Sequence, residues 1–409
     1  MQTKSLRIAM LSIHSSPLGP LGTRDTGGMS VYIRETAREL GRLGHRVDIF
    51  TRRTVRVGDP VIALAENVRL VHLSTGNGIN VPKEALHRHI ADFRRALESF
   101  RNHHVLDYDL IHSHYWLSGS LGDMVREGWQ RPHVITFHTL GAVKNSTGVG
   151  EPESLLRIAT EKNLAATCER VLSTTAKDKV QLVRLYDAVS DKIGVVPCGV
   201  DLNLFRPLGM AAARHRLGFS PDHPIVLFVG RFDSVKGIDR LVTAMRYLRR
   251  KDSQRLVLVG GDGLASPATR CLQKQASDLG LQDSVTFAGR IVQDRLPLYY
   301  SAADVLVVPS FYESFGLVGL EALACGTPVV ATPVGAMESI LQQGRTGQVV
   351  TEAAPRLLAD AIEAFLPNKA RKTVSAADIR ASVLQFSWSK VAAALAAEYA
   401  GVCAIGASS

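Results

Sequence analysis

The stretch from Ser310 to Ala331 carries the strongest chemical signal in the sequence. Glu313 precedes a short glycine-containing loop at a predicted helix start, where backbone amides can point at hydroxyl or phosphate groups. Glu321 follows eight residues later, about two helical turns, so both carboxylates can point toward one elongated ligand. A carboxylate accepts two hydrogen bonds at once, which makes it the natural partner of vicinal sugar hydroxyls. The apolar flanking sequence argues against two merely solvated acids.

A second loop, Gly230 to Gly237, follows an apolar run and opens a predicted helix. It carries Arg231 and Lys236, five residues apart. Arginine offers a planar fork of donors and lysine a point charge, which together suit a diphosphate. Two solvated surface cations are the alternative interpretation of this spacing.

The first predicted strand ends in His14, and the loop after it leads to the pair Gly27 and Gly28. Glycines at a helix start let backbone N–H groups approach an oxyanion, although a tight turn has the same appearance. The spacing is not G-x-G-x-x-G, and no other position supplies that fingerprint in the right context. A nicotinamide-dependent enzyme is therefore disfavoured.

Histidines end two further predicted strands. His112 and His114 face the same side of one strand and could meet one metal ion, but no third ligand lies at metal-like spacing. Packing and hydrogen bonding are the favoured roles, with Tyr115 reaching the ligand-facing loop. His138 follows the next strand in the same kind of position. The sequence predicts no metal site.

Short apolar runs alternate with amphipathic stretches along almost the whole chain, which predicts parallel sheets flanked by helices on both faces. A length of 409 residues favours two domains. Strands are expected over 7–13, 46–50, 109–112, 133–137 and 192–196, and again over 224–229, 255–259, 284–288, 303–308 and 328–331. Helices are expected over 29–43, 237–249, 316–324 and 388–401, the last packing back across the first domain. Ligands of such sheets bind beyond the carboxyl ends of the strands.

Composition excludes several classes of protein. Lys and Arg number 48 against 38 Asp and Glu, a net charge of +10, yet no run of five or six cations appears, as a nucleic-acid arm would show. The excess favours small anionic ligands. The five cysteines form no C-x-x-C pair, which predicts reduced thiols and a cytoplasmic setting. The start of the chain reads as a strand and not a signal peptide, and no run has the ~18 apolar residues of a membrane span.

Taken in order, the motifs G-G-M-S-V-Y, H-S-H-Y-W, H-T-L, G-R-F-x-x-x-K-G, E-S-F-G-L-V-x-L-E-A and G-T-P-V-V-A resemble those of the glycosyltransferase family 4 enzymes. These are retaining transferases of the two-domain GT-B fold, and the match covers both domains. The first-domain motifs are most similar to the branch that glycosylates D-inositol 3-phosphate in mycothiol synthesis. Sucrose-phosphate synthases share several of the same elements.

The resemblance implies an N-terminal acceptor-binding domain over residues 1–205, completed by the terminal helix over about 386–409, and a nucleotide-sugar-binding domain over 206–385. It implies a catalytic set of Arg231, Lys236, Glu313 and His138. Arg231 and Lys236 would hold the donor diphosphate, Glu321 the ribose hydroxyls, and His138 the O6 region of the sugar. Glu313 would bind the sugar hydroxyls. The rest of the implied donor site is Gly27, Gly28, Arg290, Ile291, Ser314, Phe315, Gly316 and Leu317, with the backbone of Arg290 and Ile291 at the uracil edge.

On the acceptor side the resemblance implies a phosphate clamp. Its members are Lys83, Tyr115, Thr139 and Arg157, with His14 and Ser30 beside them. The inositol-phosphate branch has Asn where this chain has Ser30, and the loop between His138 and Arg157 is two residues shorter here. Both departures concern the identity of the acceptor, not the reaction.

The expected activity is transfer of a hexose, GlcNAc or glucose, from a UDP-sugar to a phosphorylated small acceptor such as inositol 3-phosphate. The alternatives are transfer to fructose 6-phosphate, a peripheral membrane enzyme with a lipid acceptor, and a nucleotide-sugar binding protein without activity. No cofactor is expected to be required, with Mg²⁺ accepted but not essential. The expected partners are the two substrates and no nucleic acid, in a monomer or homodimer. The charge permits membrane association, although no long basic amphipathic helix in the first domain indicates it.

Overall fold

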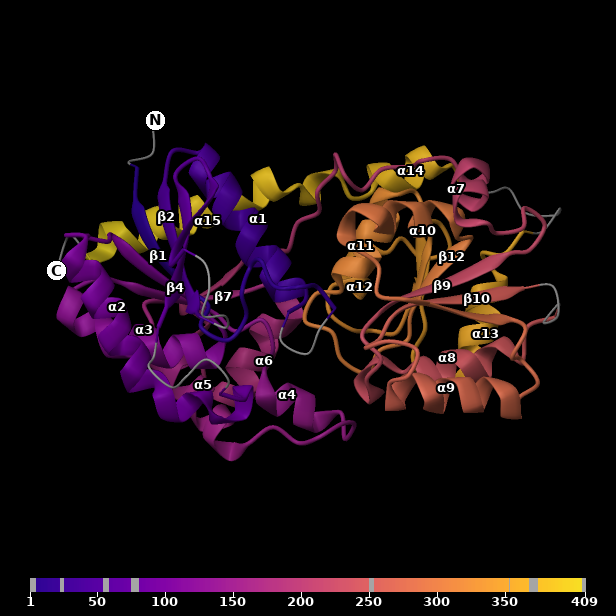
Figure 1. Ribbon diagram of the computed structural model, residues 1–409, viewed down its shortest axis with the longest axis horizontal. Coiled ribbons are helices and arrows are strands. Elements are labelled where there is room, and N and C mark those ends of the chain that lie inside the picture. The colour runs from indigo at the N-terminus through magenta and orange to yellow at the C-terminus, as the bar shows by residue number, and fades with distance from the viewer. Residues whose placement is uncertain are drawn as a thin grey trace.

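Two β-sheets organise the chain, one in each half, and the two halves lie side by side (Figure 1). The computed structural model describes residues 5–22, 26–53, 59–74, 81–249, 254–352, 354–367 and 374–406. Each sheet is flanked by helices on both faces. The predicted architecture of two doubly wound α/β domains facing each other is confirmed.

The first sheet has eight strands in the order β3-β4-β2-β1-β5-β6-β7-β8. They are β1 (Arg7–Leu11), β2 (Arg46–Arg52), β3 (Val61–Ala65), β4 (Val68–Leu73), β5 (Leu110–His114), β6 (His133–Thr136), β7 (Arg170–Ser173) and β8 (Ile193–Val195). Its helices are α1 (Gly28–Arg42), α2 (Ile90–His103), α3 (Tyr115–Trp129), α4 (Gly141–Ser146), α5 (Leu155–Thr167) and α6 (Ala176–Tyr186), with 3₁₀ turns η2 (Lys83–His89) and η3 (Ser190–Lys192).

Strict alternation of strand and helix was the wrong expectation at one edge of this sheet. β3 and β4 follow each other directly and pair antiparallel, while every other pairing in the sheet is parallel. A two-residue turn joins them, and Asn67 in that turn has a left-handed φ of 61°. Asparagine tolerates this conformation, which is why so short a hairpin closes here.

The second sheet has six parallel strands in the order β11-β10-β9-β12-β13-β14. They are β9 (Ile225–Gly230), β10 (Arg255–Gly260), β11 (Val285–Gly289), β12 (Val305–Val308), β13 (Val329–Ala331) and β14 (Gly347–Val349). The helices in this half of the chain are α7 (Met210–Leu217), α8 (Ile238–Met245), α9 (Pro267–Asp278), α10 (Leu296–Ala302), α11 (Leu317–Ala324), α12 (Met337–Ile340), α13 (Pro355–Glu363) and α14 (Ala376–Ala381), with 3₁₀ turns η4 (Ser234–Lys236), η5 (Gln293–Arg295) and η6 (Leu384–Phe386). The last helix is α15 (Trp388–Gly406).

Strands buried on both faces explain the continuous apolar runs of the sequence. In β1, Ile8 and Met10 pack toward α1 and α15, whereas Ala9 and Leu11 pack toward α2 and α3. The same division holds in β9, where Val226 and Phe228 belong to the cluster of α8, α9 and α13. Parallel sheets covered on both faces favour such runs over alternation.

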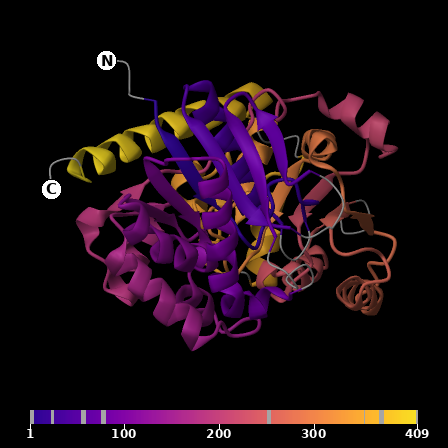
Figure 2. The same cartoon turned by 60° about the vertical axis from the view of Figure 1, so that its left-hand side comes forward.

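The C-terminal helix α15 returns to the first domain, as predicted (Figures 1 and 2). It packs beside α1. The Tyr399 hydroxyl lies 2.7 Å from His112 Nδ1, and Glu398 accepts from Arg170 Nε at 2.7 Å. Residues 407–409 of the predicted terminal segment lie outside the described residues. None of the described helices combines the length and apolar character that a membrane crossing needs.

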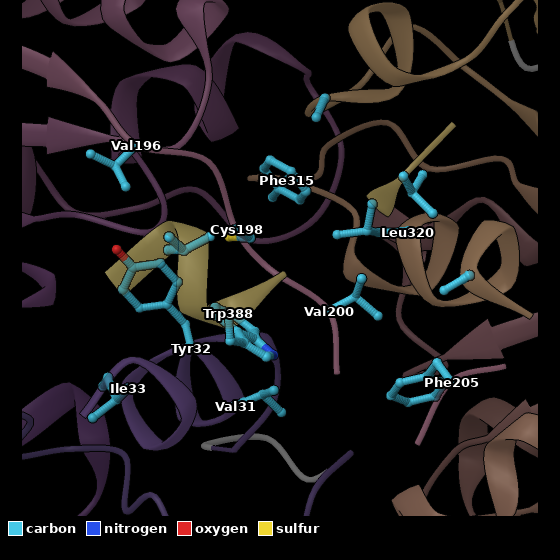
Figure 3. Close-up of a cluster of buried hydrophobic side chains, with 14 of the residues drawn as sticks. Val31, Tyr32, Ile33, Val196, Cys198, Val200, Phe205, Phe315, Leu320 and Trp388 are labelled. Carbon is cyan, nitrogen blue, oxygen red and sulfur yellow. The ribbon is translucent and has the colours of Figure 1, made fainter. Parts of the chain in front are cut away.

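One apolar cluster continues through the connection between the two domains (Figure 3). It includes Cys198 and Val200 of the connecting segment, Tyr32 of α1, Trp388 of α15 and Phe315 of the second domain. The rings of Tyr32 and Trp388 meet edge to face, with centroids 5.9 Å apart. This shared core fixes where the chain leaves one domain and enters the other.

Candidate active site

Both sheets change winding direction at a point that faces the other domain. In the first sheet this point lies between β1 and β5, and in the second between β9 and β12. Loops diverge at such a switch point, and ligands of doubly wound sheets bind there. The loops that follow these four strands line a cleft of about 470 Å³ between the domains. That volume lies in the usual range for small-molecule sites.

The cleft brings together all but one of the predicted site residues. From the first domain come His14, Gly27, Gly28, Lys83, Tyr115, His138, Thr139 and Arg157, and from the second Arg231, Lys236, Arg290, Ile291, Glu313, Ser314, Phe315, Gly316, Leu317 and Glu321. The exception is Ser30, which is fully buried in α1 with its hydroxyl 2.7 Å from that of Ser15. The position that departs from the inositol-phosphate branch therefore does not line the cleft.

The two predicted donor cations each have a carboxylate partner. Arg231 Nη2 lies 2.9 Å from Asp233 Oδ2, and Lys236 Nζ lies 2.6 Å from Glu313 Oε1. The Ser310 hydroxyl donates to the same Glu313 oxygen at 2.8 Å. These pairs hold both cations beyond the end of β9 and orient Glu313 toward Lys236. Sequence spacing predicted the cations, but not Asp233.

Two helix N-termini face each other across the cleft. A Cβ placed on Gly28 of α1 would lie 3.2 Å from Leu317 Cδ1 of α11, so the two helices meet where each begins. Gly316 caps α11 with a φ of +92°, and a Cβ there would lie 2.7 Å from Met337 Cε. Only glycine fits that backbone. Free amides and dipoles of both helices therefore favour an anionic group between them.

Glu321 lies one turn into α11 and is almost fully buried. The Tyr300 hydroxyl donates to its Oε2 at 2.7 Å. Burial raises the pKa of Glu321 to about 7, although the hydrogen bond from Tyr300 opposes the rise. Its second oxygen is available for a ligand that brings its own donors.

Tyr115 organises the cations on the first-domain side. Lys83 Nζ and Arg157 Cζ each lie 4.7 Å from the centre of its ring. Such cation–aromatic contacts stabilise buried charge. Arg157 Nη2 donates to the backbone oxygen and the hydroxyl of Thr139, both at 2.9 Å. Four predicted residues from four separate segments thus form one cluster.

Burial keeps the cleft histidines neutral. It lowers the pKa of His138 to about 3, and it lowers the pKa of His14 well below its usual value, helped by the nearby charge of Lys83. His114 Nδ1 lies 2.9 Å from His138 Nε2, which orients the His138 ring. His112 contacts Tyr399 and Thr136 instead, in the predicted packing role. In the described part of the chain, no three His, Cys, Asp or Glu are arranged to hold a metal ion.

The backbone is strained just after β5 and just after β6. Tyr115 has a φ of 74° and His138 a φ of 61°, both in the left-handed region that non-glycine residues rarely adopt. Each follows a central strand of the first sheet directly or after one residue. Strain of this kind persists where the surrounding structure enforces it, and it gathers at ligand-binding sites.

Besides Asp233, sequence reasoning missed two charged residues of the cleft, Lys144 of α4 and Glu153 before α5. Glu153 forms ion pairs with Lys144 and, at 2.8 Å, with Arg157 Nη1. Lys144 follows the H-T-L motif by four residues, so its place after β6 was the available signal. The pairing itself depends on the fold of the loop between α4 and α5.

A larger groove of about 1570 Å³ lies under α15, at the amino ends of the strands of the first sheet and away from the cleft. Arg126, Arg131 and Arg170 line it together with acidic residues such as Glu169 and Glu398. It adjoins residues that precede the strands, such as Leu6 and Pro132, and none of the predicted chemical groups reaches it. The residues predicted to do chemistry, other than Ser30, line the interdomain cleft instead.

Two family models match the chain, one in each half. The model described as Glycosyltransferase Family 4 matches residues 26–204, and the model described as Glycosyl transferases group 1 matches residues 210–380. A D-inositol 3-phosphate glycosyltransferase of Xylanimonas cellulosilytica is 39% identical over 97% of each chain. The enzyme of that name from Nocardia farcinica is 41% identical, over 96% of this chain and 89% of its own.

Solved structures share the fold over the whole chain. A sucrose-phosphate synthase of Thermosynechococcus elongatus is 34% identical, with a TM-score of 0.89 over 98% of this chain and all of its own. HepE of Anabaena, solved with UDP and glucose, has a TM-score of 0.75 at 20% identity, over 96% of this chain and 99% of its own.

Proposed function

Because the chain belongs to glycosyltransferase family 4, we propose that it moves a hexose from a UDP-sugar to a hydroxyl of a small phosphorylated acceptor, retaining the configuration at the anomeric carbon. One observation carries the proposal. A single cleft holds two groups of charges. Arg231 and Lys236 lie beside the two helix N-termini, where the donor would bind, and a separate cation cluster lies around Tyr115, where the acceptor would bind. The second domain, over 206–385, would bind the donor, and residues 1–205 with the terminal helix the acceptor.

The donor side suits a nucleoside diphosphate sugar. Arg231 and Lys236 would bind the diphosphate, with Gly28 and Leu317 marking the helix N-termini that receive its oxygens. Glu321 would accept hydrogen bonds from the ribose hydroxyls. The backbone at Arg290 and Ile291 would meet uracil, and Glu313 and His138 the sugar. The HepE structure, which holds UDP and glucose, supports a uridine nucleotide in a cleft of this fold.

The acceptor side suits a phosphate group. Lys83, Arg157 and Thr139 supply cationic and hydroxyl donors around Tyr115. The names of the relatives at about 40% identity support inositol 3-phosphate as the acceptor. Fructose 6-phosphate is the second candidate, which the 34% identity to a sucrose-phosphate synthase favours.

The chemistry needs no residue that forms a covalent bond. The bond from the anomeric carbon to the diphosphate oxygen breaks, and the acceptor oxygen attacks the same face. The departing diphosphate oxygen takes the proton of the acceptor hydroxyl. Arg231 and Lys236 would stabilise the charge that develops on the diphosphate, and they replace a catalytic metal in this role. The remaining contribution of the cleft is orientation and exclusion of water.

Product analysis tests the proposal. The protein is incubated with UDP-glucose or UDP-GlcNAc and either inositol 3-phosphate or fructose 6-phosphate, and products are identified by mass spectrometry and proton NMR. A glycosylated phosphate ester with an α-configured anomeric centre is expected, since the donors are α-linked. A β-configured product would contradict retention, and transfer to neither phosphorylated acceptor would contradict the proposed acceptor class.

A further inference from the structure

The acceptor end of the cleft already contains an anion. The carboxylate of Glu153 lies between Lys144 and Arg157, bonded to Lys144 Nζ and 2.8 Å from Arg157 Nη1. All three side chains line the cleft, as does Lys83, which contacts the same Tyr115 ring as Arg157. The carboxylate therefore occupies the place between two cations that a phosphate group of an acceptor would take.

The two carboxylates that contact Arg157 differ in how firmly they are held. Glu161 is completely buried and accepts from three donors: Gly141 N at 2.9 Å, the Tyr186 hydroxyl at 2.6 Å and Arg157 Nε at 2.7 Å. Removing it would leave buried donors unpaired, so it is a permanent partner. Glu153 keeps 21% of its side chain exposed, so its carboxylate can turn to water.

The backbone of Glu153 is fixed independently of its side chain. Asn145 of α4 accepts from the Glu153 N–H at 2.7 Å and donates to the Glu153 carbonyl at 3.1 Å. Rotation about the side-chain bonds can therefore release the carboxylate without any movement of the loop. The carboxylate can therefore move while Arg157, buried and bonded to Glu161 and Thr139, stays in place.

Charge matching favours replacement of the Glu153 carboxylate by a phosphate group. Lys83, Lys144 and Arg157 supply three positive charges, and Glu153 and Glu161 supply two negative ones, so the net charge of the cluster is +1. With Glu153 turned away, the net charge is +2. A phosphate monoester carries about −1.5 to −2 at neutral pH and so matches the cluster without Glu153, not with it.

We propose that Glu153 is a specificity-determining residue of the acceptor site: its carboxylate occupies the phosphate position when no acceptor is bound, and only a phosphate group displaces it. This inference rests on the phosphorylated acceptor proposed above. A neutral polyol or sugar brings no charge to replace the carboxylate, so it leaves the ion pairs in place and is not seated. Lys144 then becomes a direct ligand of the phosphate.

Glu153 is ionised under assay conditions. Burial alone would raise its pKa, but the neighbouring charges of Arg157 and Lys144 outweigh burial and hold the pKa below its usual range. Changing Glu153 to Gln therefore removes a real charge. Glu151, which is exposed on the same segment and does not line the cleft, provides a matched control for the loss of one negative charge.

The test is a calorimetric titration of inorganic phosphate into the full-length protein at saturating UDP, which keeps phosphate out of the donor site. Removing one competing charge at a partly solvated site should tighten phosphate binding by about fivefold or more in Glu153→Gln. Glu151→Gln should stay within about twofold of wild type, as a distant exposed charge does. Lys144→Gln should weaken binding. Unchanged or weaker binding in Glu153→Gln would overturn the inference.

Turnover separates this inference from the proposed function. If Glu153 excludes neutral acceptors, Glu153→Gln should raise kcat/KM for the unphosphorylated acceptor by a larger factor than for the phosphorylated one, and so lower the ratio of the second value to the first. A ratio unchanged from wild type would contradict the inference, whatever the acceptor. If wild type glycosylates no phosphorylated acceptor, the proposed function is wrong. The phosphate titration still decides whether the Glu153 carboxylate competes with phosphate for the cation cluster. Melting temperatures of the three variants verify that each is folded.

Discussion

Glu321→Gln should abolish a pH dependence that the wild-type cleft imposes on donor binding. Glu321 is buried in the first turns of α11 with the Tyr300 hydroxyl at 2.7 Å, and burial raises its pKa to about 7. Ribose hydroxyls donate hydrogen bonds, and an ionised carboxylate accepts them at both oxygens. A protonated carboxyl has a weaker acceptor in one position and a donor of its own. The ionised form is therefore the one that binds the donor well.

The size of the effect follows from the position of the pKa. With a pKa of about 7, the ionised fraction falls from about nine-tenths at pH 8 to about one-tenth at pH 6. If only the ionised form binds, the affinity for the donor falls about tenfold over that interval, or about 1.4 kcal/mol. Glutamine cannot ionise, so the affinity of the variant for the donor should be the same at pH 6 and pH 8. At pH 8 it should be lower than the affinity of wild type.

Isothermal titration with UDP-glucose at pH 6, 7 and 8, without acceptor, measures this directly. UDP-glucose is preferred to UDP because its diphosphate is blocked by the sugar and has no oxygen that titrates in this range. Asp178, whose pKa burial raises to about 6, is present in both proteins, so its contribution cancels in the comparison. A wild-type affinity that is constant within twofold, or a Gln variant with the same tenfold change, would refute the reasoning.

The same group gives a stability prediction of definite sign. A carboxyl with a raised pKa keeps its proton in the folded state at a pH where the unfolded chain has released it. The contribution of Glu321 to the stability of wild type should therefore fall as the pH rises from about 4.5 toward 7, the interval between the ordinary and the raised pKa. Glu321→Gln should gain stability relative to wild type over that interval in urea denaturation, and a relative loss would contradict the raised pKa.

Three further substitutions test other parts of the account. Lys236→Ala should lower kcat about 100-fold or more because the departing diphosphate loses a counter-charge; steady-state UDP release measures this, and activity within threefold of wild type would argue against the clamp. Tyr399→Phe leaves His112 Nδ1 without the hydroxyl at 2.7 Å and should cost about 1–3 kcal/mol in urea unfolding, with an unchanged midpoint as the contrary result. Ser30→Ala breaks the bond to Ser15 and should cost about 1 kcal/mol. It should leave the acceptor KM within about twofold, whereas a tenfold rise would show that Ser30 reaches the acceptor.

The fold was predictable wherever burial on both faces leaves a continuous apolar run. The run 224–229 became β9, and the run 303–308 contains β12, because both are central strands of a covered parallel sheet. The hairpin of β3 and β4 was missed for the opposite reason. β3 lies at the edge of the sheet and is only partly buried, so its sequence carries little of the signal that marks the central strands.

The candidate site was predictable where one loop holds the whole pattern. Arg231 and Lys236 share the segment between β9 and α8, and the residues from Glu313 to Glu321 share the loop after β12 and the start of α11, so spacing alone placed them near a strand end. Contacts between distant segments left no such signal. Nothing in the sequence shows that α15 brings Tyr399 to His112, 287 positions away, or which face of α1 carries Ser30.

Dependence of turnover on the acceptor's phosphate tests the central claim most directly. UDP release is measured with UDP-GlcNAc and UDP-glucose against inositol 3-phosphate, fructose 6-phosphate, their unphosphorylated forms and no acceptor. The cation cluster around Tyr115 predicts that kcat/KM for one phosphorylated acceptor exceeds that for its unphosphorylated form by about 100-fold or more. Equal release with the unphosphorylated acceptor would contradict the account.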